Sequence, residues 1–148
     1  MRIVIIGGGI AAVYTANALL EEQNDIEVVI VSEEQYAPYD RIHLCALVDA
    51  SEEIEGVTLE LNPAVNVELN QKIVSIDSKG KHVYSEHAMF NYDTLIITTG
   101  SRPKTLFDIS DVDNAITFRS ADDSFKIAQN ISDKNVIIMG VGPIGLEL

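Results

Sequence analysis

Apolar and mostly β-branched residues form four runs without polar alternation, which predict buried strands at Arg2–Ile6, Glu27–Val31, Thr94–Thr98 and Asn135–Met139. Uninterrupted runs of this kind are typical of parallel sheets that are covered on both faces. Between the first two runs, a segment rich in Ala, Leu and Glu from Ala11 to about Glu22 predicts a helix. A turn at Asn24 and Asp25 then leads into the second strand. Strand, helix and strand in this order form a βαβ unit, so we expect an α/β, Rossmann-like fold.

The middle of the chain has a different pattern. A short alternating strand is expected at Asn66–Leu69, and Ile73–Asp77 and His82–Ser85 flank the turn sequence Ser-Lys-Gly-Lys, which predicts a hairpin. Before this hairpin, the sequence of residues 36–47 predicts a loop that leads into a short helix. We therefore expect a β-hairpin or meander inserted into the parallel sheet.

Two further elements are expected after residue 110. Ile116–Phe118 is a short apolar run that predicts another strand. Ser120-Ala-Asp-Asp has the residues of a capping box, which predicts a helix from there to about Asn130.

A glycine-rich turn lies between the first strand and the first helix. Gly7-Gly8-Gly9-Ile10-Ala11-Ala12 fits Gly-x-Gly-x-x-(Gly/Ala), in which Gly7 makes the tight turn, Gly9 leaves room for a pyrophosphate and Ala12 allows close packing. Phosphates would lie on the helix N-terminus, at Ile10 and Ala11, where free N–H groups favour negative charge. At the end of the second strand, a carboxylate would hold the adenosine ribose, with Glu33 as first candidate and Glu34 as the fallback. The alternative is a simple turn with solvated acids.

Composition narrows the range of partners. The 148 residues are 47% hydrophobic and 22% charged, as in an ordinary soluble domain. A formal charge of −13 argues against nucleic acid as a partner, and the apolar runs are too short to span a membrane. The single cysteine, together with a first strand that begins almost at Met1, predicts a cytoplasmic protein without a signal peptide.

The segment that follows the second strand resembles a known family. Ser-Glu-Glu-Gln-Tyr-Ala-Pro-Tyr-Asp-Arg-Ile-His-Leu, residues 32–44, is similar to the loop at this place in pyridine nucleotide–disulfide oxidoreductase-type FAD reductases. Its second half, Tyr39–Leu44, is most similar to the form in the large subunit of NAD(P)H-dependent nitrite reductase. The resemblance implies that Arg41 lies along the flavin nucleotide, whereas a surface arginine paired with an acid is the alternative.

A second stretch, Tyr92–Pro103, resembles the family's second FAD signature, in which a strand ends in Ala-Thr-Gly. Here Thr98 replaces the alanine, and Thr99 and Gly100 are the residues implied to pass close to the cofactor. The resemblance further implies that the backbone of Ile73 holds the adenine and that Arg119 contacts FAD.

A second glycine motif lies near residue 140. The sequence Gly-Val-Gly-Pro-Ile-Gly-Leu-Glu at 140–147 resembles the family's NAD(P)H-binding motif, with candidate residues Gly140, Gly142, Gly145 and Glu147. We expect residues 1–134 to be the first segment of an FAD-binding domain, itself incomplete. Residues 135–148 would begin an NAD(P)H-binding domain that is truncated, so we expect the fragment alone to be inactive.

The resemblance implies that hydride passes from NAD(P)H to FAD and that electrons then go to an acceptor, either nitrite or a small redox protein. We expect no metal site, because no Cys/His spacing suits one. Whether the protein forms a homodimer is left open.

Cys45 supports an alternative enzyme class. A redox cysteine lies near this place in cysteine-based NADH oxidases and coenzyme A-disulfide reductases, although Ala46 follows it here where those families have glycine. The resemblance to the reductases and an inert role for a cysteine in the protein interior favour the non-catalytic interpretation. Three hypotheses therefore remain: an FAD-dependent reductase of the nitrite, rubredoxin or ferredoxin reductase type, a cysteine-based enzyme, and a non-catalytic nucleotide-binding module.

Overall fold

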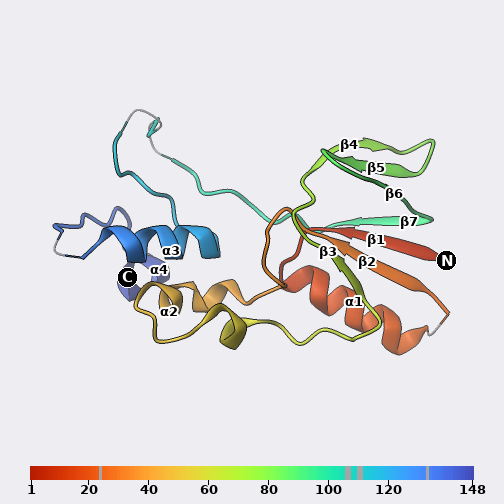
Figure 1. The fold of residues 1–148 in the computed structure, drawn as a ribbon, viewed down its shortest axis with the longest axis horizontal. Coiled ribbons are helices and arrows are strands. Elements are labelled where there is room, and N and C mark those ends of the chain that lie inside the picture. Colours follow the sequence, from red (N-terminus) through yellow and green to blue (C-terminus); the bar gives the residue numbers. More distant parts are fainter. Residues whose placement is uncertain (24, 106–107, 110–111, 133) are drawn as a thin grey trace. The chain divides into compact units, whose positions relative to one another are not determined.

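The computed structural model describes residues 1–23, 25–105, 108–109, 112–132 and 134–148 (Figure 1). The chain divides into two compact units, one made of Met1–Tyr39 and Thr58–Gly100, the other of Asp40–Val57 and Ser101–Leu148. The part of the predicted turn that falls on Asn24 lies outside the described residues. No helix in the described ranges has the length and apolar character needed to cross a membrane.

The first unit contains a four-stranded parallel sheet in the order β3-β2-β1-β7. Its strands are β1 (Arg2–Ile6), β2 (Glu27–Val31), β3 (Asn66–Glu68) and β7 (Thr94–Ile97). β1 is central, and its Ile3 lies opposite Val28 of β2 and Thr94 of β7. The α/β, Rossmann-like class and these four strands are confirmed, with β3 and β7 each one residue shorter than predicted.

Two layers cover the parallel sheet, one on each face (Figure 1). On one face, helix α1 (Ile10–Glu22) packs Ala12, Ala16 and Leu20 against Ile3 and Ile5. The other face of β1 and β2 packs against Val83 and Phe90 of an antiparallel sheet. Because adjacent residues of a strand point to opposite faces, this two-sided cover explains why β1 and β2 are apolar at nearly every position.

The antiparallel sheet has the order β4 (Ile73–Asp77), β5 (His82–Ser85) and β6 (Met89–Asn91). The predicted hairpin is confirmed as β4 and β5, and the inserted element is therefore a three-stranded meander. β6 was not predicted, because only Phe90 of its three residues is buried and one apolar position is too short a pattern to indicate a strand.

The second unit is mainly helical. It contains the 3₁₀ turns η1 (Arg41–His43) and η2 (Ile54–Val57) and the helices α2 (Leu44–Val48), α3 (Ala121–Asn130) and α4 (Pro143–Glu147). α2 packs against α3. The short helix after the loop is confirmed as η1 and α2, and the capping box of Ser120 and Asp123 begins α3 as predicted.

Two strand predictions are wrong. Ile116–Phe118 is half-buried chain without β-structure, and Asn135–Met139 is exposed chain in which Ile137 has 88% of its surface accessible. All of these residues are described, and none of them pairs with a described strand. An apolar run becomes a strand only when a neighbouring strand satisfies its backbone N–H and C=O groups.

Candidate functional site

The first glycine turn is shaped by close contact between two strand ends. Gly7 has a φ of +112°, and its N–H donates to the carbonyl of Val31 at 2.9 Å. A Cβ at this position would lie 2.5 Å from the carbonyl oxygen of Thr98, just after β7. Both the positive φ and this contact require glycine, so Gly7 turns the chain from β1 toward α1.

Gly9 differs from Gly7 because the space around it is open. It is the N-cap of α1, and no described atom outside its chain neighbours lies within 4 Å of where its Cβ would be. The N–H groups of Ala12 and Val13 bond to the Gly9 carbonyl, which leaves those of Ile10 and Ala11 at the helix start. No described side chain caps this end, and the first turn holds no acid. Ala12 is fully buried beneath it against the sheet.

The two candidate carboxylates after β2 are in different environments. The hydroxyl of buried Tyr39 donates to Oε2 of Glu34 at 2.5 Å, so that carboxylate already anchors the loop. The carboxylate of Glu33 is exposed and has no hydrogen bond or ion pair within the described part of the chain. Of the two, Glu33 is therefore the carboxylate available to a ligand.

Ser32, which was not among the predicted site residues, lies against both Gly8 and Glu34. Its side chain is buried, its Oγ accepts from the N–H of Glu34 at 3.3 Å, and a Cβ at Gly8 would lie 2.7 Å from that oxygen. Its position directly after the buried run of β2 could have indicated that Ser32 is buried too.

The end of β7 lies beside the Gly7 turn. Thr98 donates both its N–H and its hydroxyl to the carbonyl of Ile6, at 2.8 and 3.0 Å, so the hydroxyl that replaces the family's alanine is used within the protein. Thr99 and Gly100 follow at the exposed end, with Gly100 at a φ of +70°. In the same unit, the predicted adenine contact Ile73 is the half-buried first residue of β4 and pairs with Ser85.

Arg41 and Arg119 are brought together in the second unit. Nη1 of Arg41 donates to the carbonyl of Arg119 at 2.9 Å, across 78 positions of the sequence. The N–H of Arg119 in turn donates to Oδ2 of Asp123 at 2.9 Å. The Arg41 guanidinium is therefore held, through this contact, on a backbone carbonyl.

The second glycine motif forms its turn without a preceding strand. Gly140 has a φ of +122°, Gly142 is the N-cap of α4, and a Cβ at Gly145 would collide with the carbonyl oxygen of Gly140. Glu147 is the last residue of α4 and is exposed. The chain thus folds locally into a turn and a helix start.

Cys45 lies on α2 and is partly exposed. Burial raises the pKa of its thiol, and the nearby carboxylate of Glu147 raises the pKa further. A raised pKa means less thiolate at neutral pH, which is the opposite of what a nucleophilic cysteine needs. No group of metal-binding side chains is present among the described residues.

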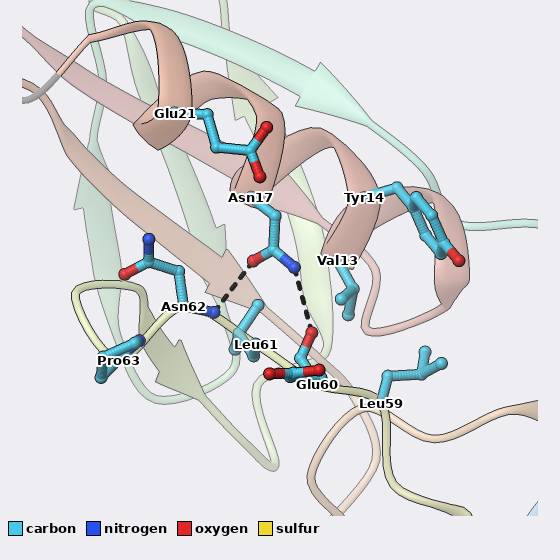
Figure 2. A pocket seen from close by; sticks show the side chains of 9 residues that line it. All are labelled: Val13, Tyr14, Asn17, Glu21, Leu59, Glu60, Leu61, Asn62 and Pro63. Carbon is cyan, nitrogen blue, oxygen red and sulfur yellow. Dashed lines mark hydrogen bonds between the residues drawn. The ribbon is translucent and has the colours of Figure 1, made fainter.

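A groove of about 470 Å³ lies between α1 and residues 59–63 (Figure 2). Figure 2 shows Asn17 at its centre, where Nδ2 donates to the carbonyl of Glu60 at 3.0 Å and Oδ1 accepts from the N–H of Asn62 at 2.9 Å. None of the predicted cofactor-binding residues lines it. Asn17 therefore fastens this segment to α1, away from the glycine turn.

Comparisons with known proteins identify the family to which this fold and glycine turn belong. A family model described as pyridine nucleotide-disulphide oxidoreductase matches residues 1–148. The chain is 28% identical over 152 residues to apoptosis-inducing factor 3 of Mus musculus, a match that covers 99% of the chain and 25% of the relative. It is 31% identical over 174 residues to monodehydroascorbate reductase, seedling isozyme, of Cucumis sativus, with 99% and 40% covered.

Among solved structures, NADH:rubredoxin oxidoreductase from Clostridium acetobutylicum superposes with a TM-score of 0.85 at 27% identity, over 99% of this chain and 40% of that one. The chain thus spans 25–40% of the length of these relatives. Flavoproteins of the matched family use FAD and take NAD(P)H as substrate. With its Rossmann-like sheet, inserted meander and glycine turn, the chain belongs to the pyridine nucleotide-disulphide oxidoreductase family.

Proposed function

We propose that this chain forms the FAD-binding part of an NAD(P)H oxidoreductase. The observation that carries the proposal is the open space at Gly9, above a helix start whose N–H groups are uncapped by any described side chain. This arrangement fits a diphosphate, which needs both room next to the backbone and donors for its oxygens. When bound, FAD supplies the chemistry, by accepting hydride from NAD(P)H and passing electrons to an acceptor.

In this proposal, the residues of the chain bind FAD and orient it. The N–H groups of Ile10 and Ala11 would donate to the diphosphate, and the positive end of the α1 dipole favours its charge. The exposed carboxylate of Glu33 would accept hydrogen bonds from the ribose hydroxyls. The Thr98 bonds to Ile6 hold the neighbouring strand end, with Thr99 and Gly100 beyond it, in place beside the same turn.

We infer that residues 1–134 belong to the FAD-binding domain and that residues 135–148 begin the NAD(P)H-binding domain, where Gly140, Gly142, Gly145 and Glu147 would contact the second nucleotide. The similarity of Tyr39–Leu44 to the nitrite reductase large subunit supports nitrite as acceptor. The similarity to an NADH:rubredoxin oxidoreductase supports a small redox protein instead. Cytoplasmic location and a homodimer remain predictions.

The proposal is tested by flavin binding. The full-length protein, stripped of any bound flavin, should take up FAD with the visible spectrum of a bound flavin, and FMN should bind far more weakly. FMN lacks the adenosine and the diphosphate, which are the parts that Glu33 and the α1 start would hold. Failure to take up FAD, or equal binding of the two flavins, would contradict the proposal.

Glu33→Ala is expected to weaken FAD binding by about 1–3 kcal/mol, because hydrogen bonds to a charged group are lost. Isothermal titration of the flavin-free protein measures this change. Glu86→Ala, which removes an exposed acid from the β5–β6 connection, serves as the control for net charge and should leave the affinity as it was. If Glu34→Gln weakened binding and Glu33→Ala did not, the ribose contact would belong to Glu34.

A further inference from the structure

A single peptide group links Asp123 to the guanidinium of Arg41. The peptide between Arg119 and Ser120 donates its N–H to Oδ2 of Asp123 at 2.8 Å, and its carbonyl accepts from Nη1 of Arg41 at 2.9 Å. Asp123 also accepts from the N–H of Arg119, and its own N–H donates to Oγ of Ser120 at 3.3 Å, which completes the capping box.

The order of charges along this link is favourable. A carboxylate at the N–H end and a guanidinium at the carbonyl end both lie along the dipole of the same peptide. Hydrogen bonds arranged in such a chain polarise and strengthen one another. Asp123 therefore fixes the orientation of the carbonyl on which Arg41 rests.

A second, independent bond sets the register between α3 and the segment that carries Arg41. Ser124, the residue after Asp123, is fully buried, and its hydroxyl donates to the carbonyl of Leu44 at 3.0 Å. Leu44 begins α2, directly after the η1 turn that contains Arg41. The start of α3 thus contacts this segment both at the Arg41 guanidinium and at the Leu44 backbone.

We propose that Asp123 is a positioning residue that orients Arg41 for its contact with the flavin nucleotide. This inference rests on the proposed function and on the resemblance of residues 32–44 to the FAD reductases, which implies that Arg41 contacts FAD. An arginine side chain has many rotamers, and holding it in one of them before the ligand arrives lowers the entropy lost on binding. Asp123 contributes to FAD affinity without touching FAD, through the Arg119–Ser120 peptide.

A double-mutant cycle on FAD affinity in the full-length protein tests this role. Asp123→Ala is expected to weaken FAD binding about fivefold, the scale of losing one capping interaction. Arg41→Ala should weaken it more, and adding Asp123→Ala to Arg41→Ala should cause no further loss, because the two residues act through one bond. Additive losses would overturn the inference, since Asp123 would then act independently of Arg41.

Two further variants separate positioning from helix stability. Asp123→Glu keeps a carboxylate able to close a capping box and should restore FAD affinity. Gln129→Gly, at an exposed position of α3, weakens the helix by a similar amount and should leave FAD affinity unchanged. If Gln129→Gly lowered the affinity as much as Asp123→Ala, the effect would come from helix stability and the inference would fail.

The cycle also distinguishes this inference from the proposed function. If the wild-type protein binds FAD and Arg41→Ala does not weaken binding, the positioning role falls while FAD binding stands. If the wild-type protein takes up no FAD, both fall together.

Discussion

Replacing Gly9 by valine should abolish FAD retention while the chain still folds. No described atom outside its chain neighbours lies within 4 Å of the position that a Cβ would take at Gly9, so the side chain meets no distant part of the protein there. It would instead occupy the space proposed for the diphosphate, beside the N–H groups of Ile10 and Ala11. Flavin content after purification and FAD titration of the flavin-free protein measure the loss.

The cost to folding should be small and can be measured separately. Valine is a poor N-cap compared with glycine, so a loss of stability of about 1 kcal/mol is expected from this effect alone. Gly9→Ser provides the matched control, because serine is a favourable N-cap that would stabilise the helix start. Its hydroxyl would nevertheless compete with the diphosphate for the N–H of Ala11, and we expect weaker FAD binding at equal or higher stability. Wild-type FAD affinity in Gly9→Val would show that the motif only makes a turn.

Gly7→Ala should differ from Gly9→Val, because we expect it to lower the stability of the fold strongly even in the absence of FAD. Alanine would have to adopt a φ near +112°, and its Cβ would lie 2.5 Å from the carbonyl oxygen of Thr98. Backbone strain and overpacking together are expected to lower the free energy of unfolding by about 2–5 kcal/mol. Chemical denaturation in the absence of flavin measures this change.

Gly142→Ala is the control for Gly7→Ala. Gly142 has a φ of −73°, and no described atom outside its chain neighbours lies within 4 Å of its Cβ position, so alanine there should cost only the difference of a poorer N-cap, about 1 kcal/mol. A Gly7→Ala protein as stable as the wild type would mean that the Thr98 carbonyl can move aside, and that the contact between the β1 and β7 ends is not rigid.

Gly7 and Gly9 thus illustrate two different needs for glycine in one motif. The pattern predicts both positions, but it does not distinguish a glycine required by the fold from a glycine that leaves room for a ligand. That distinction comes from what surrounds each Cβ position. It makes the two substitutions separable by experiment, one through ligand binding and the other through unfolding.

Much of the fold was predictable because it depends on local pattern. The uninterrupted apolar runs of β1 and β2 indicated a sheet covered on both faces, and the turn at 78–81 indicated the hairpin of β4 and β5. The capping box of Ser120 and Asp123 marked the start of α3 correctly. Each of these signals is contained in neighbouring residues, and the physical forces that they reflect act over the same short range.

The tertiary structure decided whatever depends on a partner distant in the chain. The apolar run Asn135–Met139 is not a strand, since no described strand pairs with it, whereas the weakly marked β6 is one because β5 lies beside it. The hydroxyl of Tyr39 bonds to the carboxylate of Glu34, and the Arg41 guanidinium bonds to a carbonyl 78 residues away. Residue type and spacing by themselves determined the fold class, the family and the glycine turn. Hydrogen bonds and packing between distant segments decided which side chains remain available to a ligand, because those contacts exist only once the chain has folded.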